Sequence, residues 1–197
     1  MNENSTKQTT TNTIPNNCIW YESANGEIVE PHDCSSFDAN IVSNTYKDGK
    51  GVIAFDKDIT RIDGFAFCRC TGLTSVTIGN SVTSIGGDAF NGCTRLTNIT
   101  IPYGVTKIGA LAFRGCAGLT SVTIPDSVVF IGWYAFRGCV GLKNIYCKRA
   151  TPPTISPDAF DNIAPDAQIY VPRASDIAYQ SNKCWKNYVS KIVDCDF

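Results

Sequence analysis

Four cysteines recur at intervals of 23 residues, and each of them closes a short motif that begins with Ala-Phe. The motifs read AFCRC, AFNGC and, twice, AFRGC, and they end at Cys70, Cys93, Cys116 and Cys139. Regularly spaced thiols are candidates for disulfides or for a metal site. The first motif adds Cys68, which forms a C-x-C pair with Cys70. Whether this row does chemistry depends on where the backbone places its members.

The single histidine, His32, lies in the segment EPHDCSSF, and any Ser-His or Cys-His nucleophile would depend on it. Its neighbours Glu30, Asp33 and Cys34 have the residue types of a metal or nucleophile cluster. A histidine in a polar loop is more often solvated than catalytic. The sequence also has no phosphate-binding glycine loop and no H-E-x-x-H or G-x-S-x-G motif. We therefore expect no enzyme, no cofactor and no metal, and the His32 loop is the one catalytic alternative.

The cysteine motifs are part of a longer repeat of 23 residues. Each copy opens with an L-x-x-V/I-x-I pattern, in which Val76 and Ile78 alternate with polar residues as in a half-buried strand. Pro102 and Pro125 end two of these strands, and a later glycine marks a turn. The Ala-Phe pair indicates a short helical or 3₁₀ turn on the opposite side. A fixed period of this length is typical of stacked units, so the sequence predicts a solenoid with a parallel sheet.

This stacking favours a packing role for the cysteine row. Neighbouring coils lie about 4.8 Å apart, so the repeated cysteines are expected to form an inward-pointing column. Parallel side chains keep their Cβ atoms as far apart as the coils, beyond the ~3.8 Å that a disulfide prefers. A linear row also offers no tetrahedral metal site. We therefore expect buried thiols that act as small apolar core residues.

Charge and hydropathy exclude several classes of function. The 17 basic and 18 acidic residues nearly balance, which argues against nucleic-acid binding and against an electrostatic membrane anchor. No apolar run approaches the ~20 residues that a membrane-spanning helix needs. Residues 1–17 are polar, rich in Asn and Thr, and unlike a signal peptide, which predicts a disordered tether. Either the protein is not exported, or Met1 replaces an export signal that was removed.

The consensus of the copies, L-x-x-I-x-I-P-x-x-V-x-x-I-G-x-x-A-F-x-x-C, resembles the BspA-type leucine-rich repeat family of bacterial surface proteins. The resemblance covers residues 50 to about 160, and the flanks at 39–60 and 150–172 are also similar to that family. It implies a right-handed leucine-rich-repeat solenoid of the α/β type, with six short parallel strands on one face and a cap at each end. It also implies a secreted or cell-surface location and a non-catalytic role in adhesion or partner binding.

Two caps complete the expected organisation. The N-terminal cap, residues 18–49, is expected to contain a β-hairpin around Asn25-Gly26, a favoured two-residue turn. The C-terminal part, residues 166–197, is expected to combine a terminal strand with one or two covering helices. Disulfides within the caps would join Cys18 to Cys34 and Cys184 to Cys195. The repeats between the caps span residues 50–72, 73–95, 96–118, 119–141 and 142–165.

Candidate partner-binding residues lie on two sides of the predicted coil. Phe130, Trp133 and Tyr134 occupy positions that are mostly polar or small in other copies, which predicts an exposed aromatic patch. The alternative is that the last coil or the C-terminal cap covers them. The exposed sheet face carries hydroxyl and amide groups, which are also common on any solvated strand. The candidates are Thr100, Leu111, Arg114, Thr123, Phe130, Trp133, Tyr134, Arg137, Asn144 and Tyr146.

The sequence thus favours a recognition module that binds a protein or glycan on a host or neighbouring cell. It predicts no nucleic-acid partner and no transmembrane segment, and the aromatic patch would also allow a weak homo-oligomer. The first alternative is a structural spacer in a larger surface protein, with no ligand of its own. The less favoured alternative is an enzyme that uses the His32 loop.

Overall fold

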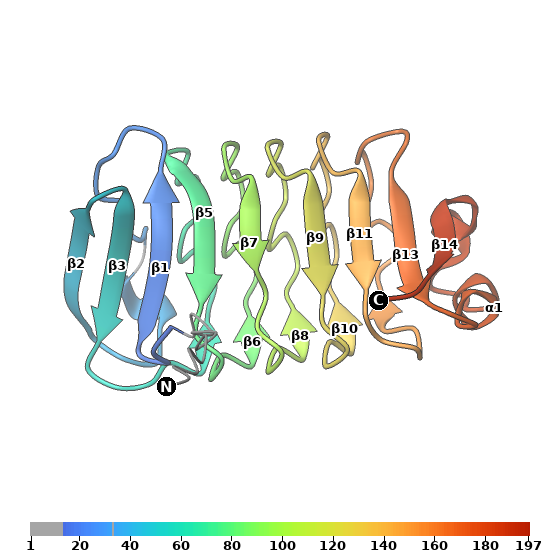
Figure 1. Ribbon diagram of the computed structural model, residues 1–197, viewed down its shortest axis with the longest axis horizontal. Coiled ribbons are helices and arrows are strands. Elements are labelled where there is room, and N and C mark those ends of the chain that lie inside the picture. The colour runs from blue at the N-terminus through green and yellow to red at the C-terminus, as the bar shows by residue number, and fades with distance from the viewer. Residues whose placement is uncertain (1–13, 33) are drawn as a thin grey trace, which may run out of the picture.

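The computed structural model describes residues 14–32 and 34–197, and its repeats form a solenoid of stacked coils. The coils follow one another along the long axis of the molecule (Figure 1). Equivalent residues of successive copies are neighbours in space, as Val76 and Ile99 are at a step of 23 residues. The stacked-coil fold predicted from the repeat is therefore confirmed.

The first strand of each coil lies on one face, which we call the front sheet (Figure 1). Parallel pairing places Val76 opposite Ile99 and Val122 opposite Ile145, so one register is kept from coil to coil. The step from Ile145 to Ile169 is one residue longer, because the final copy is stretched. The repeat strands are β3 (Lys50–Phe55), β5 (Leu73–Ile78), β7 (Asn98–Thr100), β9 (Ser121–Ile124), β11 (Asn144–Cys147) and β13 (Gln168–Pro172).

A second parallel ladder, absent from the sequence-based prediction, runs along the opposite side of the coils and is called the back sheet. Each of its strands has two residues, an outward residue followed by a buried isoleucine. Alternation over two residues is too short to recognise in a sequence. These strands are β4 (Arg61–Ile62), β6 (Ser84–Ile85), β8 (Lys107–Ile108), β10 (Phe130–Ile131) and β12 (Thr154–Ile155).

The Ala-Phe pair lies in a single i→i+3 turn and not in a helix: the Arg137 N–H, for example, donates to the Tyr134 carbonyl over 3.1 Å across Ala135 and Phe136. A second tight turn comes directly before the pair. In one copy the Ala135 N–H donates to the Gly132 carbonyl over 3.3 Å, while Tyr134 between them has a φ of 55°. This combination is that of a type II turn, which needs a left-handed residue at its third position. Two columns of such positions run along the molecule. One contains Phe65, Asp88, Leu111 and Tyr134, and the other contains Arg69, Gly92, Gly115 and Gly138.

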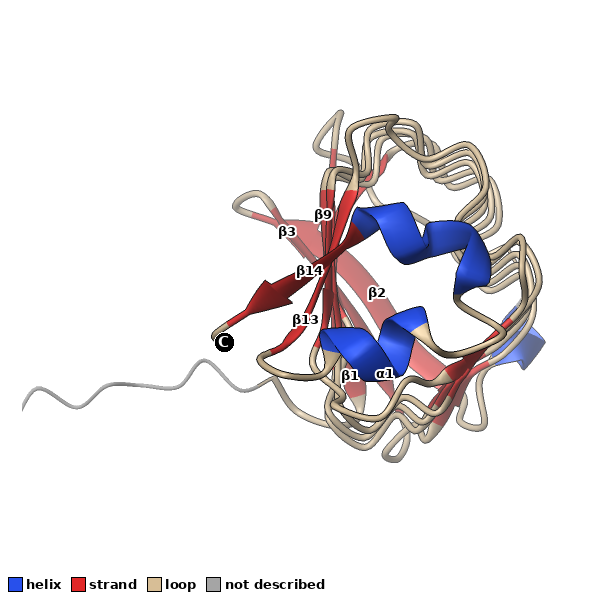
Figure 2. Cartoon of the chain, turned by 90° about the vertical axis from the view of Figure 1, so that its right-hand side faces the viewer, coloured by secondary structure: helices blue, strands red, loops and turns tan. Residues whose placement is uncertain are grey.

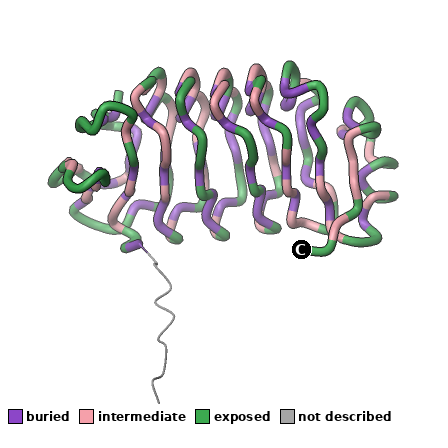
Figure 3. Tube along the Cα trace, turned by 45° about the horizontal axis from the view of Figure 1, so that its top comes forward, coloured by how far each residue is buried: buried purple, intermediate pink, exposed green. Residues whose placement is uncertain are grey.

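Buried residues recur at equivalent positions from coil to coil and face the interior between the two sheets (Figure 3). Ring centroids in the phenylalanine column are 5.1 to 5.3 Å apart. The thiols of three cysteines each lie 3.0 to 3.2 Å from a phenylalanine carbonyl oxygen of the preceding coil. These three thiols are fully buried, which confirms that the repeated cysteine packs the core in those copies. Cys70 of the first copy was expected in the same column but is only partly buried, because it lies at the end of the coils beside the Glu30 carbonyl of the N-terminal cap. The phenylalanines are Phe67, Phe90, Phe113, Phe136 and Phe160, and the cysteines are Cys93, Cys116 and Cys139.

The N-terminal cap inserts a strand into the front sheet. Strand β1 (Cys18–Ser23) pairs antiparallel with β3 on one side and with β5 on the other, so it separates the first two repeat strands. The hairpin expected around Asn25-Gly26 is not formed, because both edges of β1 are already occupied. The hairpin of this cap instead joins β2 (Ile41–Lys47) to β3 through a two-residue turn at Asp48 and Gly49.

Residues 14–17, which the sequence assigned to a tether, pack against the first coils. The Asn17 carbonyl accepts a hydrogen bond from the Phe55 N–H over 2.9 Å, and the Asn16 carbonyl accepts one from Ile59. Ile14 is buried. The remainder of the expected tether, residues 1–13, lies outside the described residues.

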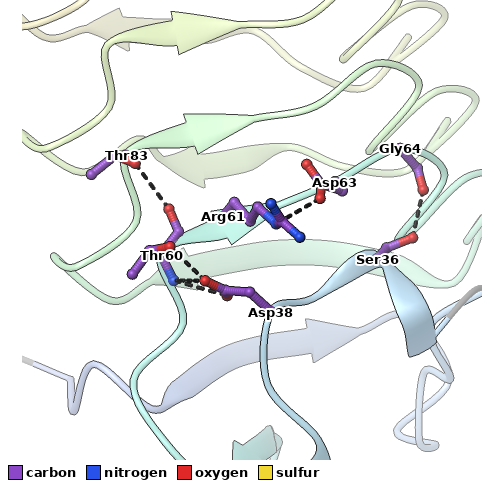
Figure 4. Close-up of polar contacts among 7 residues, drawn as sticks. All are labelled: Ser36, Asp38, Thr60, Arg61, Asp63, Gly64 and Thr83. Carbon is purple, nitrogen blue, oxygen red and sulfur yellow. Dashed lines mark hydrogen bonds and ion pairs between the residues drawn. The ribbon is translucent and has the colours of Figure 1, made fainter.

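Polar contacts join the cap to the first coil (Figure 4). Asp38 accepts hydrogen bonds from the Thr60 N–H at 3.0 Å and from the Thr60 hydroxyl at 2.5 Å. Ser36, at the end of the 3₁₀ helix η1 (Cys34–Ser36), donates its hydroxyl to the Gly64 carbonyl. Thr83 repeats the pattern one coil later by donating its hydroxyl to the Thr60 carbonyl over 3.1 Å. The first coil is thus held on both sides of β4.

The C-terminal cap closes the other end of the coils (Figure 2). It contains helix α1 (Asp176–Gln180), the 3₁₀ helix η2 (Lys186–Lys191) and strand β14 (Ile192–Cys195), which extends the front sheet beside β13. Tyr179 and Trp185 are fully buried, and the Trp185 indole N–H donates to the Pro153 carbonyl over 2.9 Å. The sequence predicted short helices and a terminal strand, which is β13, but it did not predict strand β14. Within the two described ranges, no helix is long and apolar enough to cross a membrane.

Candidate functional site

The ten candidate residues do not form a single site, because the structure distributes them over three surfaces. Two residues lie on the solvent-facing side of the back sheet, four lie at the turns that follow this sheet, and four lie on the front sheet. The groups are Phe130 and Trp133; Leu111, Arg114, Tyr134 and Arg137; and Thr100, Thr123, Asn144 and Tyr146.

A shallow groove of about 310 Å³ runs along the outside of the back sheet, and we call it the back groove. Its walls carry the outward residues of β6, β8 and β10, and its floor is built from glycines of successive coils. It is lined by Asp63, Ser84, Ile85, Gly86, Gly87, Lys107, Gly109, Ala110, Phe130, Gly132 and Trp133.

The floor of the back groove requires glycine because neighbouring coils approach closely there. A Cβ atom on Gly109 would lie 2.5 Å from the Gly86 carbonyl carbon, and one on Gly132 would lie 2.6 Å from the Ala110 nitrogen. The next column contains Gly64, Gly87 and Ala110 before it reaches Trp133. Three small residues therefore leave open space beside one indole.

Trp133 is 65% exposed, so neither the last coil nor the C-terminal cap covers its ring. Phe130 is half-buried, and the Lys107 Nζ lies 5.7 Å from the centre of its ring. At the other end of the groove Asp63 forms an ion pair of 2.8 Å with Arg61. The back groove thus combines an exposed indole with one cation and one carboxylate.

The second surface is the row of turns after the back sheet. Leu111 and Tyr134 occupy left-handed backbone positions, with φ values of 61° and 55°. The Arg137 guanidinium lies 4.6 Å from the centre of the Tyr134 ring, and Arg114 is exposed one coil earlier. Because the arginine covers it, Tyr134 is only half-exposed and does not line the back groove with Phe130 and Trp133. The predicted patch of three aromatic residues is therefore divided.

The third surface is the front sheet. Tyr146 stacks on Tyr170 with ring centroids 4.9 Å apart, and the ring of Phe197 meets Tyr146 edge-on. The Lys148 Nζ lies 3.6 Å from the centre of the Phe197 ring. Tyr146 therefore belongs to a packed cluster, whereas Thr100 and Thr123 line a separate groove between β7 and β9.

The His32 loop shows no catalytic arrangement in its described part. The His32 side chain is exposed, and its backbone N–H donates to the Ala66 carbonyl over 2.8 Å. Asp33, one member of the cluster suggested by the sequence, lies outside the described residues. Among residues 14–32 and 34–197, no group of three His, Cys, Asp or Glu residues is placed to hold a metal ion.

All ten cysteines lie in the described ranges and have free thiols, including the two pairs suggested for the caps. Burial raises the pKa of the Cys147 thiol to about 12. Burial, and to a lesser degree the nearby Cys68, raises the pKa of Cys70 to about 11. These thiols are protonated at neutral pH and are poor nucleophiles, because the thiolate is the reactive form.

Stacked coils with a groove on each of two faces define a repeat solenoid, and the candidate sites lie on its surface. The chain belongs to the BspA type leucine-rich repeat family, whose repeat region matches residues 46–165 in six copies. This confirms the resemblance drawn from the repeat consensus. A search of curated proteins gives no match.

Solved structures of bacterial leucine-rich repeat proteins have similar folds. The leucine-rich repeat protein of T. pallidum is 25% identical with a TM-score of 0.56, and covers 71% of this chain and 63% of its own. A leucine-rich cell surface protein of Faecalibacterium prausnitzii is 28% identical with a TM-score of 0.54, over 72% of this chain and 34% of its own. The pneumococcal vaccine antigen PcpA, 18% identical with a TM-score of 0.56 over 79% and 48%, shares the fold. This chain therefore spans less than two thirds of each.

Sequence reasoning missed most residues that shape the back groove. The candidates drawn from the sequence do not include Asp63, Ser84 or Lys107, because the two-residue strands of the back sheet are too short to recognise in a sequence. The signal that could have found the groove is the glycine that follows three of the five back-sheet isoleucines, namely Gly86, Gly109 and Gly132. A column without side chains in a stacked fold leaves a trough.

Proposed function

We propose that this solenoid is a non-catalytic recognition or adhesion module of a secreted or cell-surface protein, which binds a protein or glycan partner at the back groove. The observation that supports it is the exposed indole of Trp133 beside a glycine floor. A tryptophan left in water forgoes the free energy of burying its ring, and exposed aromatic residues are enriched in binding surfaces.

The shape and charge of the groove support the same proposal. The groove is open and shallow, so it suits a partner surface or an extended chain better than an enclosed small molecule. Lys107 supplies a positive charge at the groove, whereas the charge of Asp63 is paired with Arg61, so the groove favours a partner with an acceptor or anionic group beside an apolar one. The cell-surface description of the F. prausnitzii protein supports the proposed location.

A binding experiment with Trp133→Ser tests the proposal. The wild-type chain and the variant are applied to arrays of glycans and of extracellular matrix proteins. We expect array partners of the wild type to bind the variant at least about tenfold more weakly, because an exposed aromatic anchor is lost. The melting temperature is expected to stay nearly unchanged, since the ring is mostly in water.

Ile177→Ser is the control, because Ile177 is an exposed apolar residue of the C-terminal cap that lines neither the back groove nor the groove between β7 and β9. It should leave array binding unchanged. Arrays on which the wild type binds nothing would contradict the proposal and favour a spacer without a ligand. A large fall in the melting temperature of Trp133→Ser would show that the ring serves packing.

A further inference from the structure

The front sheet is interrupted between β7 and β9. Ladder registers join β5 to β7, β9 to β11 and β11 to β13. All residues of β7 and β9 are described, yet the two strands share no ladder, and one sheet ends at β7 while the next begins at β9. Each strand therefore turns an edge toward the other without regular pairing.

Particular hydrogen bonds are missing at this step. The Thr97 N–H donates to the Thr74 carbonyl, and the Lys143 N–H to the Thr120 carbonyl, each over 2.9 Å. Among the described residues the equivalent bond from Thr120 to Thr97 is absent. Pro125 removes a second donor: the Lys148 N–H, one coil later in the same column, donates to the Ile124 carbonyl over 2.9 Å, and proline has no N–H.

The interruption opens a groove, which we call the front groove, while the coils stay joined behind it. On the back sheet Lys107 still pairs with Phe130 and Ile108 with Ile131. The front groove has a volume of about 290 Å³, and Tyr103 beside it is 75% exposed. It is lined by Asn98, Ile99, Thr100, Ile101, Tyr103, Ser121, Val122, Thr123 and Pro125.

The N-terminal end of this molecule shows what such an opening can hold. There β1 lies between the consecutive repeat strands β3 and β5 and pairs antiparallel with both. Behind β1 the same two coils remain joined, because Arg61 pairs with Ser84 and Ile62 with Ile85. These coils thus separate on the front face, accept an added strand and keep the back ladder intact.

We propose that the front groove is a second binding site, which accepts an extended polypeptide segment as an added strand between β7 and β9. Unpaired strand edges present alternating donors and acceptors at strand spacing, and a polypeptide backbone matches both. The groove widens around the ladder between β8 and β10 to take the strand, as the first two coils are spread around β1. Alternate side chains of the segment are apolar, as Ile19 and Tyr21 of β1 are where they face the core.

A peptide that copies the strand already accepted by this fold is the probe. It consists of residues 17–24 with the change Cys18→Ser, and it is titrated into the full chain while backbone amide resonances and their hydrogen exchange are followed. We expect shifts and slowed exchange at residues 97–101 and 120–125. A peptide of the same sequence with N-methylated alternate amides should not bind, because it lacks the donors for one of the two strand edges and its methyl groups block pairing with that edge.

Two proline variants test the geometry. Pro125→Lys restores the donor that Lys148 supplies one coil later, so it should close the groove and weaken peptide binding about tenfold, as expected for losing access to a few hydrogen bonds. Pro102→Lys is the matched control, because Pro102 is the same column position at the step from β5 to β7, where the ladder is already formed. It should leave peptide binding unchanged.

Several outcomes would overturn the proposal. Shifts confined to β3 and β5 would mean that the peptide exchanges with β1, and equal binding of the N-methylated peptide would mean that no strand is added. The absence of any resonance shift in the wild-type chain at millimolar peptide would also contradict the proposal, whatever the variants show. Trp133→Ser should not alter peptide binding, so failure of the back-groove proposal and failure of this one can be told apart.

Discussion

Left-handed backbone positions occur twice in each of the first four coils, and the residue type at each one sets its local energy. In the second column three copies use glycine, whereas the first copy has Arg69 with a φ of 60°. A residue with a Cβ is strained there by roughly 1–2 kcal/mol, and glycine is not. In the first column all four residues carry side chains, so the molecule keeps Leu111 and Tyr134 on its surface in spite of that strain.

We predict opposite effects for two substitutions in the glycine column. Gly115→Ala should lower the free energy of unfolding by about 1 kcal/mol, because its φ is 70° while its Cβ would meet only Gly92 at 3.9 Å. Arg69→Gly should raise it by about 0.5 kcal/mol, since relief of strain exceeds the entropy that glycine gains on unfolding. Urea denaturation of both variants measures the difference. Equal destabilisation by both would show that strain does not govern this column.

At the scale of elements, the N-terminal cap is held by hydrogen bonds that depend on a charged carboxylate. Burial alone would raise the pKa of Asp38, but the hydrogen bonds from the Thr60 hydroxyl and N–H lower it by more, and the pKa lies below its usual value. A carboxylate with a lowered pKa stabilises the folded state above the pKa of the unfolded chain, about 3.9. That contribution is lost as the pH falls through the folded value.

We therefore predict a pH-dependent effect of Asp38→Asn. The variant should be less stable than the wild type above about pH 5, by less than ~1 kcal/mol because the site is largely hydrated. The difference should shrink below about pH 4, where the wild-type carboxyl also becomes neutral. Denaturant midpoints between pH 3 and 7 measure it. A constant difference across this range would mean that the charge of Asp38 makes no contribution.

At the scale of the whole molecule, each coil contacts only its neighbours, and stability is approximately a sum over adjacent interfaces. The open ends are therefore the places where the core must be covered. Trp185 covers one end: it is fully buried, its ring lies 6.2 Å from that of Phe160, and it hydrogen-bonds to Pro153.

Trp185→Ala is expected to destabilise the C-terminal end in particular. Truncation of a buried tryptophan costs roughly 3–5 kcal/mol. Because coupling is between neighbours, hydrogen exchange should accelerate first in β12 and β13, while β5 and β6 stay protected. Ile177→Ala, an exposed position of the same cap, serves as the control and should have little effect. Uniform acceleration along the chain would contradict this dependence on neighbouring coils.

The sequence by itself determined the coil, its period and its core. Apolar residues repeated at a fixed spacing are all buried when each copy stacks on the next. The identity of the columns is local information, and Cys116 or Phe113 can be recognised as core without knowing the fold in detail. Only the tertiary structure decided the features that depend on which backbone segments lie side by side. These features are the insertion of β1 between β3 and β5, the back sheet, and the absence of a hydrogen bond between Thr120 and Thr97. Each depends on whether backbone groups of segments distant in sequence pair with one another. Such pairings use groups common to every residue, so no side-chain pattern records them.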